Sequence, residues 1–217
     1  NLNKAEVIVY FNAILNKDAV LGYKGNVNKA KLEYSCNPNV DQNGDQIEET
    51  EETAEDSVIA FTYLLDVNKL DEGEKKEGSE ELQYQPLPGA TFKLEKGVIA
   101  ASGTVDWRTY KEFTSDQTGT KFEIKGLDDG IYKLTEEPPK GYKPVDPIIF
   151  SVTANHHDDD EWDGTDATRY SILTDLNGAL YDVTTGKEIT GDVSNGLITF
   201  KHLKDNEGLA LDVVNKP

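Results

Sequence analysis

The sequence has few cationic side chains, a single cysteine and no methionine. Its 22 lysine and arginine residues are outnumbered by 41 aspartate and glutamate residues, which gives a formal net charge of −19 at pH 7. Phosphate groups repel such a surface, so the composition argues against binding to nucleic acid or to an anionic membrane. A lone Cys36 excludes an internal disulfide bond, and its expected role is that of a small buried thiol.

Long apolar runs and targeting segments are also absent. No stretch approaches the roughly 20 apolar residues that a membrane-spanning helix needs, and the first residues do not form a charged and then apolar signal segment. We therefore expect a mature fragment of a soluble, surface-exposed protein. Its 217 residues suffice for one large domain or two modest ones.

Short alternating segments separated by turn residues fill most of the chain, and helical periodicity is not sustained anywhere. The residues around Trp107 and Phe113 fit this pattern least and are expected to form a less regular insertion. Strands are predicted at residues 7–11, 28–35, 63–69, 89–94, 121–125, 132–136, 148–152, 170–173, 197–200 and 209–215. This pattern predicts an all-β protein built as an immunoglobulin-like β-sandwich.

One predicted strand carries a carboxyl group on its apolar face. Tyr132, Leu134 and Glu136 alternate with polar residues and are followed by two prolines, which cannot continue a hydrogen-bonded ladder. By the period of two, Glu136 points into the core with Tyr132 and Leu134. Burial there favours the neutral acid over the carboxylate. Glu136 therefore needs polar partners.

Two other predicted strands supply such partners. Lys69 shares the face of Tyr63, Leu65 and Val67, and Asn215 shares the face of Leu209, Leu211 and Val213. A buried amine tends to be neutral, and a neutral amine is a nucleophile. Lys69 can then attack the side-chain carbonyl of Asn215 while Glu136 polarises it, carries protons and helps ammonia to leave. The product is a Lys–Asn isopeptide bond; the alternative is a buried, hydrogen-bonded cluster without a covalent bond.

These strands also carry a family resemblance. The pattern YxLxExxPxGY at residues 132–142 resembles the E-box of Cna B-type domains in the sortase-assembled pilins of Gram-positive bacteria. The segments FTYLLDVNK at 61–69, LPGATFKL at 87–94 and VVN at 213–215 resemble the rest of that domain, in the same order. The resemblance implies a Lys69–Asn215 cross-link with Glu136 as the catalytic residue. No cofactor and no metal ion is implied.

The same resemblance implies a structural role. We expect a shaft subunit of a covalently polymerised, cell-wall-anchored extracellular pilus (fimbria). Its partners would be neighbouring pilin subunits, joined through sortase-made links, and host surface ligands. Enzyme activity is not expected beyond the single, self-directed formation of the isopeptide bond. An adhesin stalk or tip domain that binds a host glycan or matrix protein is the alternative, and an exposed aromatic groove containing Trp107 or Trp162 would favour it.

Two domains are expected, with the boundary after residue 57. Residues 58–217 would form the Cna B-type domain, and residues 1–57 would provide the last strands of a preceding middle domain and an acidic linker. Asn28, in phase with Ala30 and Leu32, is the candidate cross-linked asparagine of that preceding domain, and Asn37 ranks second. The lysine partner of Asn28 would precede residue 1.

Two acidic motifs resemble functional sites only in residue type. Residues 156–161, of sequence HHDDDE, contain metal-ligand types but not the spacing of a known site, so an exposed loop is favoured. Glu136 and Glu137 resemble a glycosidase pair in type only, because adjacent strand residues face opposite ways.

Overall fold

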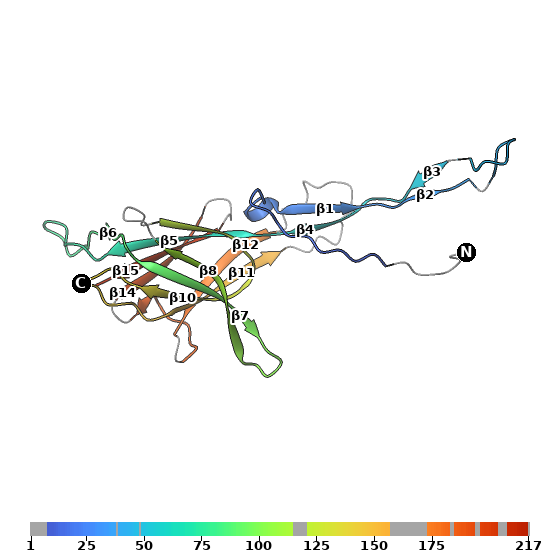
Figure 1. Cartoon of the computed structure of the whole chain (residues 1–217). Helices are drawn as coiled ribbons and strands as arrows, with labels where there is room; N and C mark the ends of the chain where they lie inside the picture. Colours follow the sequence, from blue (N-terminus) through green and yellow to red (C-terminus); the bar gives the residue numbers. More distant parts are fainter. Residues whose placement is uncertain are drawn as a thin grey trace.

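The computed structural model describes residues 8–37, 39–47, 49–114, 121–156, 173–182, 185–193, 196–203 and 208–216. Within these ranges the chain forms a β-sandwich from which a narrow two-stranded ribbon extends (Figure 1). The described residues include one short 3₁₀ turn and no α-helix. Accordingly, no described helix could cross a membrane. The predicted all-β fold is confirmed.

The ribbon contains the N-terminal elements of the chain. These are η1 (Gly22–Lys24), β1 (Asn26–Ala30), β2 (Glu33–Ser35), β3 (Thr50–Glu52) and β4 (Asp56–Ala60). β1 pairs with β4 and β2 pairs with β3, both antiparallel. The predicted strand 28–35 is therefore divided in two, and residues 8–11 of the predicted strand 7–11 lie outside any strand. The expected domain boundary falls inside β4.

Two sheets form the sandwich. The first has the order β12-β11-β10-β7-β8, and the second has the order β13-β14-β15-β5-β6, with β9 also paired to β5. The strands are β5 (Tyr63–Asp71), β6 (Gln85–Pro86), β7 (Thr91–Ile99), β8 (Val105–Thr114), β9 (Lys121–Leu127), β10 (Gly130–Glu137), β11 (Ile148–His156), β12 (Leu173–Tyr181), β13 (Asp192–Val193), β14 (Gly196–His202) and β15 (Gly208–Asn215).

The first and last strands of the sandwich lie side by side and run in the same direction. β5 and β15 are parallel, with Lys69 opposite Val213 and Asp71 opposite Asn215, whereas every other described strand pair is antiparallel. A parallel pair cannot be closed by a hairpin and needs a long crossover. Here the remaining strands of the sandwich provide that crossover.

The core lies between the two sheets, as the alternation predicts. Apolar side chains from both sheets are at most a few per cent exposed, among them Leu65, Phe92, Leu134 and Leu211. Tyr132 stacks on Phe150 with ring centroids 5.6 Å apart, and its hydroxyl donates to Asp128. The buried hydroxyl thus has a partner, which an apolar core requires.

Two strands differ from their predictions. The supposed insertion around Trp107 is wrong: it forms β8, a ten-residue edge strand paired to β7. Most β8 side chains are exposed, so its order depends on pairing rather than on an apolar pattern. Of the predicted strand at 170–173 only Leu173 belongs to β12, since residues 170–172 lie outside the described residues, and the rest of β12 was not predicted because Asn177 and Gly178 interrupt its apolar residues. A Cβ at Gly178 would lie 2.9 Å from Leu209, so close sheet packing explains the glycine.

Cys36 is a further correction. It follows β2 on the ribbon and is exposed, and its thiol lies 3.3 Å from the carbonyl oxygen of Glu49. Among the described residues no layer packs on either face of the ribbon at this point, and a two-stranded segment cannot bury the side chain as a sandwich would. The expectation of a buried thiol is wrong.

Candidate functional site

Three buried polar side chains meet between the two sheets. Lys69 on β5 and Asn215 on β15 come from neighbouring parallel strands of one sheet, and Glu136 on β10 reaches them from the opposite sheet. Lys69 and Asn215 are 0% exposed and Glu136 is 7% exposed. Each follows the apolar phase of its own strand, which is why all three point into the same core.

The contacts among the three residues connect every pair. The Lys69 amine lies 2.6 Å from Asn215 Oδ1 and 3.4 Å from Glu136 Oε1. Asn215 Nδ2 donates to Glu136 Oε2 at 3.0 Å. One carboxyl group therefore contacts the amine with one oxygen and the amide nitrogen with the other. Glu136 reaches the two nitrogen atoms, whereas the amide oxygen faces the amine.

Main-chain groups complete the hydrogen bonding. The Lys69 amine also donates to the carbonyl oxygens of Leu70 at 3.0 Å and Val213 at 3.1 Å. Asn215 Nδ2 donates to the carbonyl of Lys143 at 2.8 Å, and the N–H of Val145 donates to Glu136 Oε2 at 3.2 Å. These partners fix all three side chains, because each contact uses a group that cannot rotate away.

Burial dominates the electrostatics of the lysine. Removal from water lowers the pKa of Lys69 below its ordinary value of 10.5, although the negative charges of Glu136 and Asp71 oppose this shift. At a given pH, a larger fraction of Lys69 is therefore in the neutral amine form than for a lysine in water. Glu136 Oε1 has no hydrogen bond, since its 3.4 Å approach to Lys69 is an ion-pair contact without hydrogen-bond alignment. That free oxygen can accept a proton.

A second polar cluster on the outer face of the same sheet provides a contrast. Lys201 pairs with Asp212, which also accepts from Asn68 at 2.7 Å. The Lys201 side chain is 61% exposed. Lys69, which has the same kinds of neighbours, is 0% exposed. Burial therefore distinguishes Lys69 from Lys201.

The predicted site residues have different outcomes. The structure brings Lys69, Glu136 and Asn215 together, and Glu137 faces solvent on the other side of β10. Asn28 lies on β1 opposite Val58 and is exposed, so its proposed cross-link stays a prediction. The acidic motif beyond residue 156 and Trp162 lie outside the described residues.

Sequence reasoning missed the groups supplied by the turn after β10. The carbonyl of Lys143 and the N–H of Val145 contact the site, and Tyr142 ties the turn to Asp71 at 2.8 Å. Side-chain patterns cannot identify main-chain partners. The available signal was the stiff Pro-Pro-Lys-Gly-Tyr sequence directly after a core-facing glutamate.

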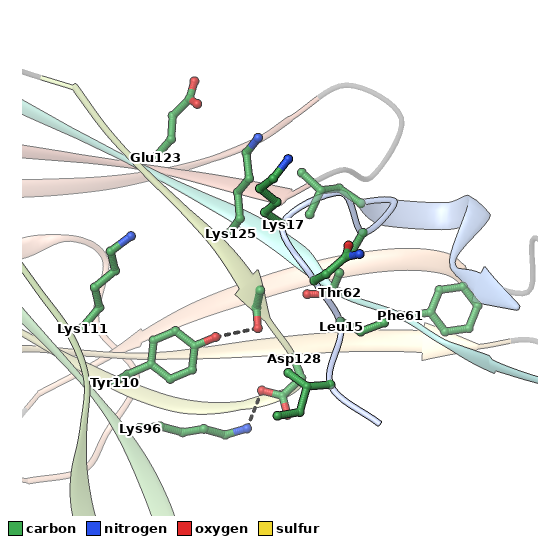
Figure 2. Close-up of a pocket in the computed structure, with 15 residues that line it drawn as sticks. Leu15, Lys17, Phe61, Thr62, Lys96, Tyr110, Lys111, Glu123, Lys125 and Asp128 are labelled. Carbon is green, nitrogen blue, oxygen red and sulfur yellow. Dashed lines mark hydrogen bonds and ion pairs between the residues drawn. The ribbon is translucent and has the colours of Figure 1, made fainter. Parts of the chain in front are cut away.

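A separate pocket of about 770 Å³ lies where residues 14–21 cross the sandwich (Figure 2). Several lysines line it, including Lys96, which pairs with Asp128, and Tyr110 donates to the carbonyl of Gly126 at 2.5 Å. None of the three core residues lines this pocket. Trp107 does not line it either, and the ring lies under the Lys133 amine at 4.8 Å.

Comparisons with known proteins found a matching family model and a sequence relative for this chain. Residues 65–168 match the family model for the SpaA prealbumin-like fold domain. The trypsin-resistant surface T6 protein of Streptococcus pyogenes serotype M6 is 29% identical over 154 residues, which are 68% of this chain and 25% of that protein. The chain thus spans about a quarter of this curated relative.

Two solved structures align with parts of the chain. The pilus adhesin SpaC of Lactobacillus rhamnosus GG, in an open conformation, has 17% identity and a TM-score of 0.35, covering 72% of this chain and 14% of its own. The pilus 2b backbone protein of group B streptococcus has 16% identity and a TM-score of 0.30, covering 83% and 47%. Residues 65–168 therefore match a SpaA-type prealbumin-like fold domain, and the chain is similar in sequence to a streptococcal surface protein.

Proposed function

We propose that this chain is part of a shaft subunit of a covalently polymerised cell-surface pilus, and that a self-formed isopeptide bond between Lys69 and Asn215 stabilises its sandwich. The observation that carries the proposal is the placement of Glu136, whose two oxygens contact the Lys69 amine and the Asn215 amide nitrogen at 3.4 and 3.0 Å. One carboxyl group in that position can take a proton from the nucleophile and give it to the leaving group.

The reaction is balanced without any other reactant. Lys69 Nζ forms a bond to Asn215 Cγ, and the bond from Cγ to Nδ2 breaks. The proton lost by the amine passes through Glu136 to Nδ2, which leaves as ammonia. Proximity supplies much of the rate acceleration, because burial and main-chain contacts hold the amine against the amide.

The relatives support the location and partners that we propose. The T6 protein is named as a trypsin-resistant surface protein, and a covalently closed sandwich would resist proteases in the same way. We infer an extracellular, cell-wall-anchored position, with sortase-made bonds to neighbouring subunits. In this proposal residues 58–217 are the cross-linked domain and residues 1–57 belong with a preceding domain.

Intact mass tests the bond directly. The purified chain is expected to weigh about 17 Da less than its sequence requires, since one ammonia is lost for each isopeptide bond. Peptide mapping should then find a branched peptide joining Lys69 to Asn215. Asn215→Ala should restore the full mass expected for its own sequence, and Lys201→Ala should keep the deficit. A parent chain with no deficit would refute the proposal.

The pH dependence of the reaction tests the state of Lys69. Only the neutral amine attacks, and burial lowers the pKa of Lys69, so the neutral form appears at lower pH than it does for a lysine in water. The rate of cross-linking in newly synthesised chain, measured by mass after acid quenching, should therefore rise with pH and then level off, with a midpoint below 10.5. A midpoint above 10.5 would mean that burial does not control the amine.

A further inference from the structure

The turn that follows β10 folds back over the site. Pro138 and Pro139 end the strand, and the N–H of Tyr142 donates to the carbonyl of Pro139 at 3.2 Å. Gly141 has a φ of +100°, a value that other residues rarely adopt. Glycine at the third position of such a turn is typical of type II turns. The sequence therefore sets a tight reversal that sends the next residues toward Asn215.

The carbonyl of Lys143 determines the orientation of the Asn215 amide. A carbonyl oxygen only accepts hydrogen bonds, so the group 2.8 Å away must be the amide NH₂ and not the amide oxygen. Glu136 cannot fix this orientation alone, because a carboxyl group accepts when ionised and donates when protonated. With Nδ2 held by Lys143, Oδ1 must face the Lys69 amine at 2.6 Å.

A clamp of two side chains holds this turn in place. The Tyr142 hydroxyl donates to Asp71 Oδ2 at 2.8 Å, and this bond raises the pKa of the Tyr142 phenol. Asp71 lies opposite Asn215 in the β5–β15 ladder, and the N–H of Glu72 donates to the carbonyl of Asn215 at 3.1 Å. The clamp thus joins the turn to the strand that carries Lys69, at the level of Asn215.

We propose that the carbonyl of Lys143 is a further catalytic group of the cross-linking reaction, and that Tyr142 and Asp71 are positioning residues for it. The inference rests on the isopeptide reaction proposed above. As Lys69 Nζ bonds to Cγ, the Lys143 carbonyl keeps one N–H of Nδ2 in place while Glu136 delivers a proton to the same nitrogen. Ammonia then leaves with Lys143 and Glu136 as its two acceptors. A loosened turn lets the amide rotate away from attack.

The test measures the cross-linking rate of newly synthesised full chain by mass, over a range of pH. Tyr142→Phe should lower the rate about tenfold at every pH, since a small misplacement of a reacting group has an effect of this size. Tyr110→Phe is the matched control, because it removes another tyrosine hydroxyl, one that donates to the carbonyl of Gly126 outside the site. It should react like the parent.

Asp71 variants separate positioning from simple loss of stability. Asp71→Ala should slow the reaction as Tyr142→Phe does. Asp71→Asn should recover much of the rate, because its amide oxygen still accepts from Tyr142. The pH midpoint at which its rate rises should also move to lower pH, since the negative charge of Asp71 raises the pKa of Lys69.

The outcomes distinguish this inference from the proposed function. A parent chain that loses no ammonia overturns both. A parent that reacts, with Tyr142→Phe reacting at the same rate, overturns only the positioning role. Failure of Asp71→Asn to recover rate beyond Asp71→Ala also overturns it, because a clamp requires only an acceptor at that position.

Discussion

Lys69→Met is expected to cause a large loss of stability in the sandwich. Methionine roughly fills the space of the lysine stem but cannot form the isopeptide bond. The proposed bond would join residues 146 positions apart. By analogy with disulfides, closing a loop of this length stabilises the fold by about 5 kcal/mol through the unfolded state. For a domain of this size that corresponds to a fall in melting temperature of about 10–20 °C.

The mechanical effect of the same change should be even larger. β5 and β15 are parallel, so tension applied before Tyr63 and after Asn215 pulls the two strands in shear. Figure 1 shows the C terminus at the end of the sandwich that lies away from the ribbon. With the bond present, force passes along β5 to Lys69 and directly into Asn215, and residues 70–214 carry no load. Without the bond those residues can extend.

Calorimetry, protease digestion and single-molecule pulling would measure these effects. Lys201→Met is the matched control, because it removes an ion-paired lysine from the strand next to β15 without touching the site. Asp212 is largely buried but keeps its hydrogen bond from Asn68 at 2.7 Å, so loss of the Lys201 amine should cost about 1–3 kcal/mol, less than the effect of Lys69→Met. A Lys69→Met chain as inextensible and protease-resistant as the parent would contradict the load-bearing role.

Glu136→Gln is expected to abolish cross-linking while the sandwich still folds. Glutamine has nearly the same shape, and its side-chain oxygen can accept from Val145 and Asn215 as Glu136 does at 3.2 and 3.0 Å. It cannot carry a proton between the amine and the amide. Loss of a positioned acid–base group slows reactions by about 10²–10⁴-fold. Glu136→Ala should also fail to react, with added destabilisation from the cavity.

Glu137→Gln provides the control for this change. Glu137 is the next residue of β10 but faces solvent, so the same chemical substitution should leave the ammonia loss intact. Mass spectrometry gives the extent of reaction, and circular dichroism shows whether each variant is folded. A Glu136→Gln chain that still loses ammonia at the parent rate would show that Glu136 is not the proton carrier.

Most strands of the core, and the side chains on them that face it, follow from the sequence alone. The alternation around Tyr63, Tyr132 and Leu211 predicts strands whose apolar faces are buried, because side chains on a strand repeat with a period of two. Lys69, Glu136 and Asn215 belong to these phases, so the sequence also predicts that they face one core. Composition and turn residues were sufficient for the all-β class.

Strand pairing and main-chain contacts are evident only in the folded structure. The sequence does not show that β5 and β15 are parallel neighbours, because strand pairing is a long-range choice made by the whole sandwich. Nor does it show that β8 is an ordered edge strand, since pairing to β7 replaces burial there. The main-chain hydrogen-bond partners of Asn215 are not evident from the sequence either. The Lys143 carbonyl is present in any residue, and only the fold of the turn brings it to 2.8 Å from Nδ2.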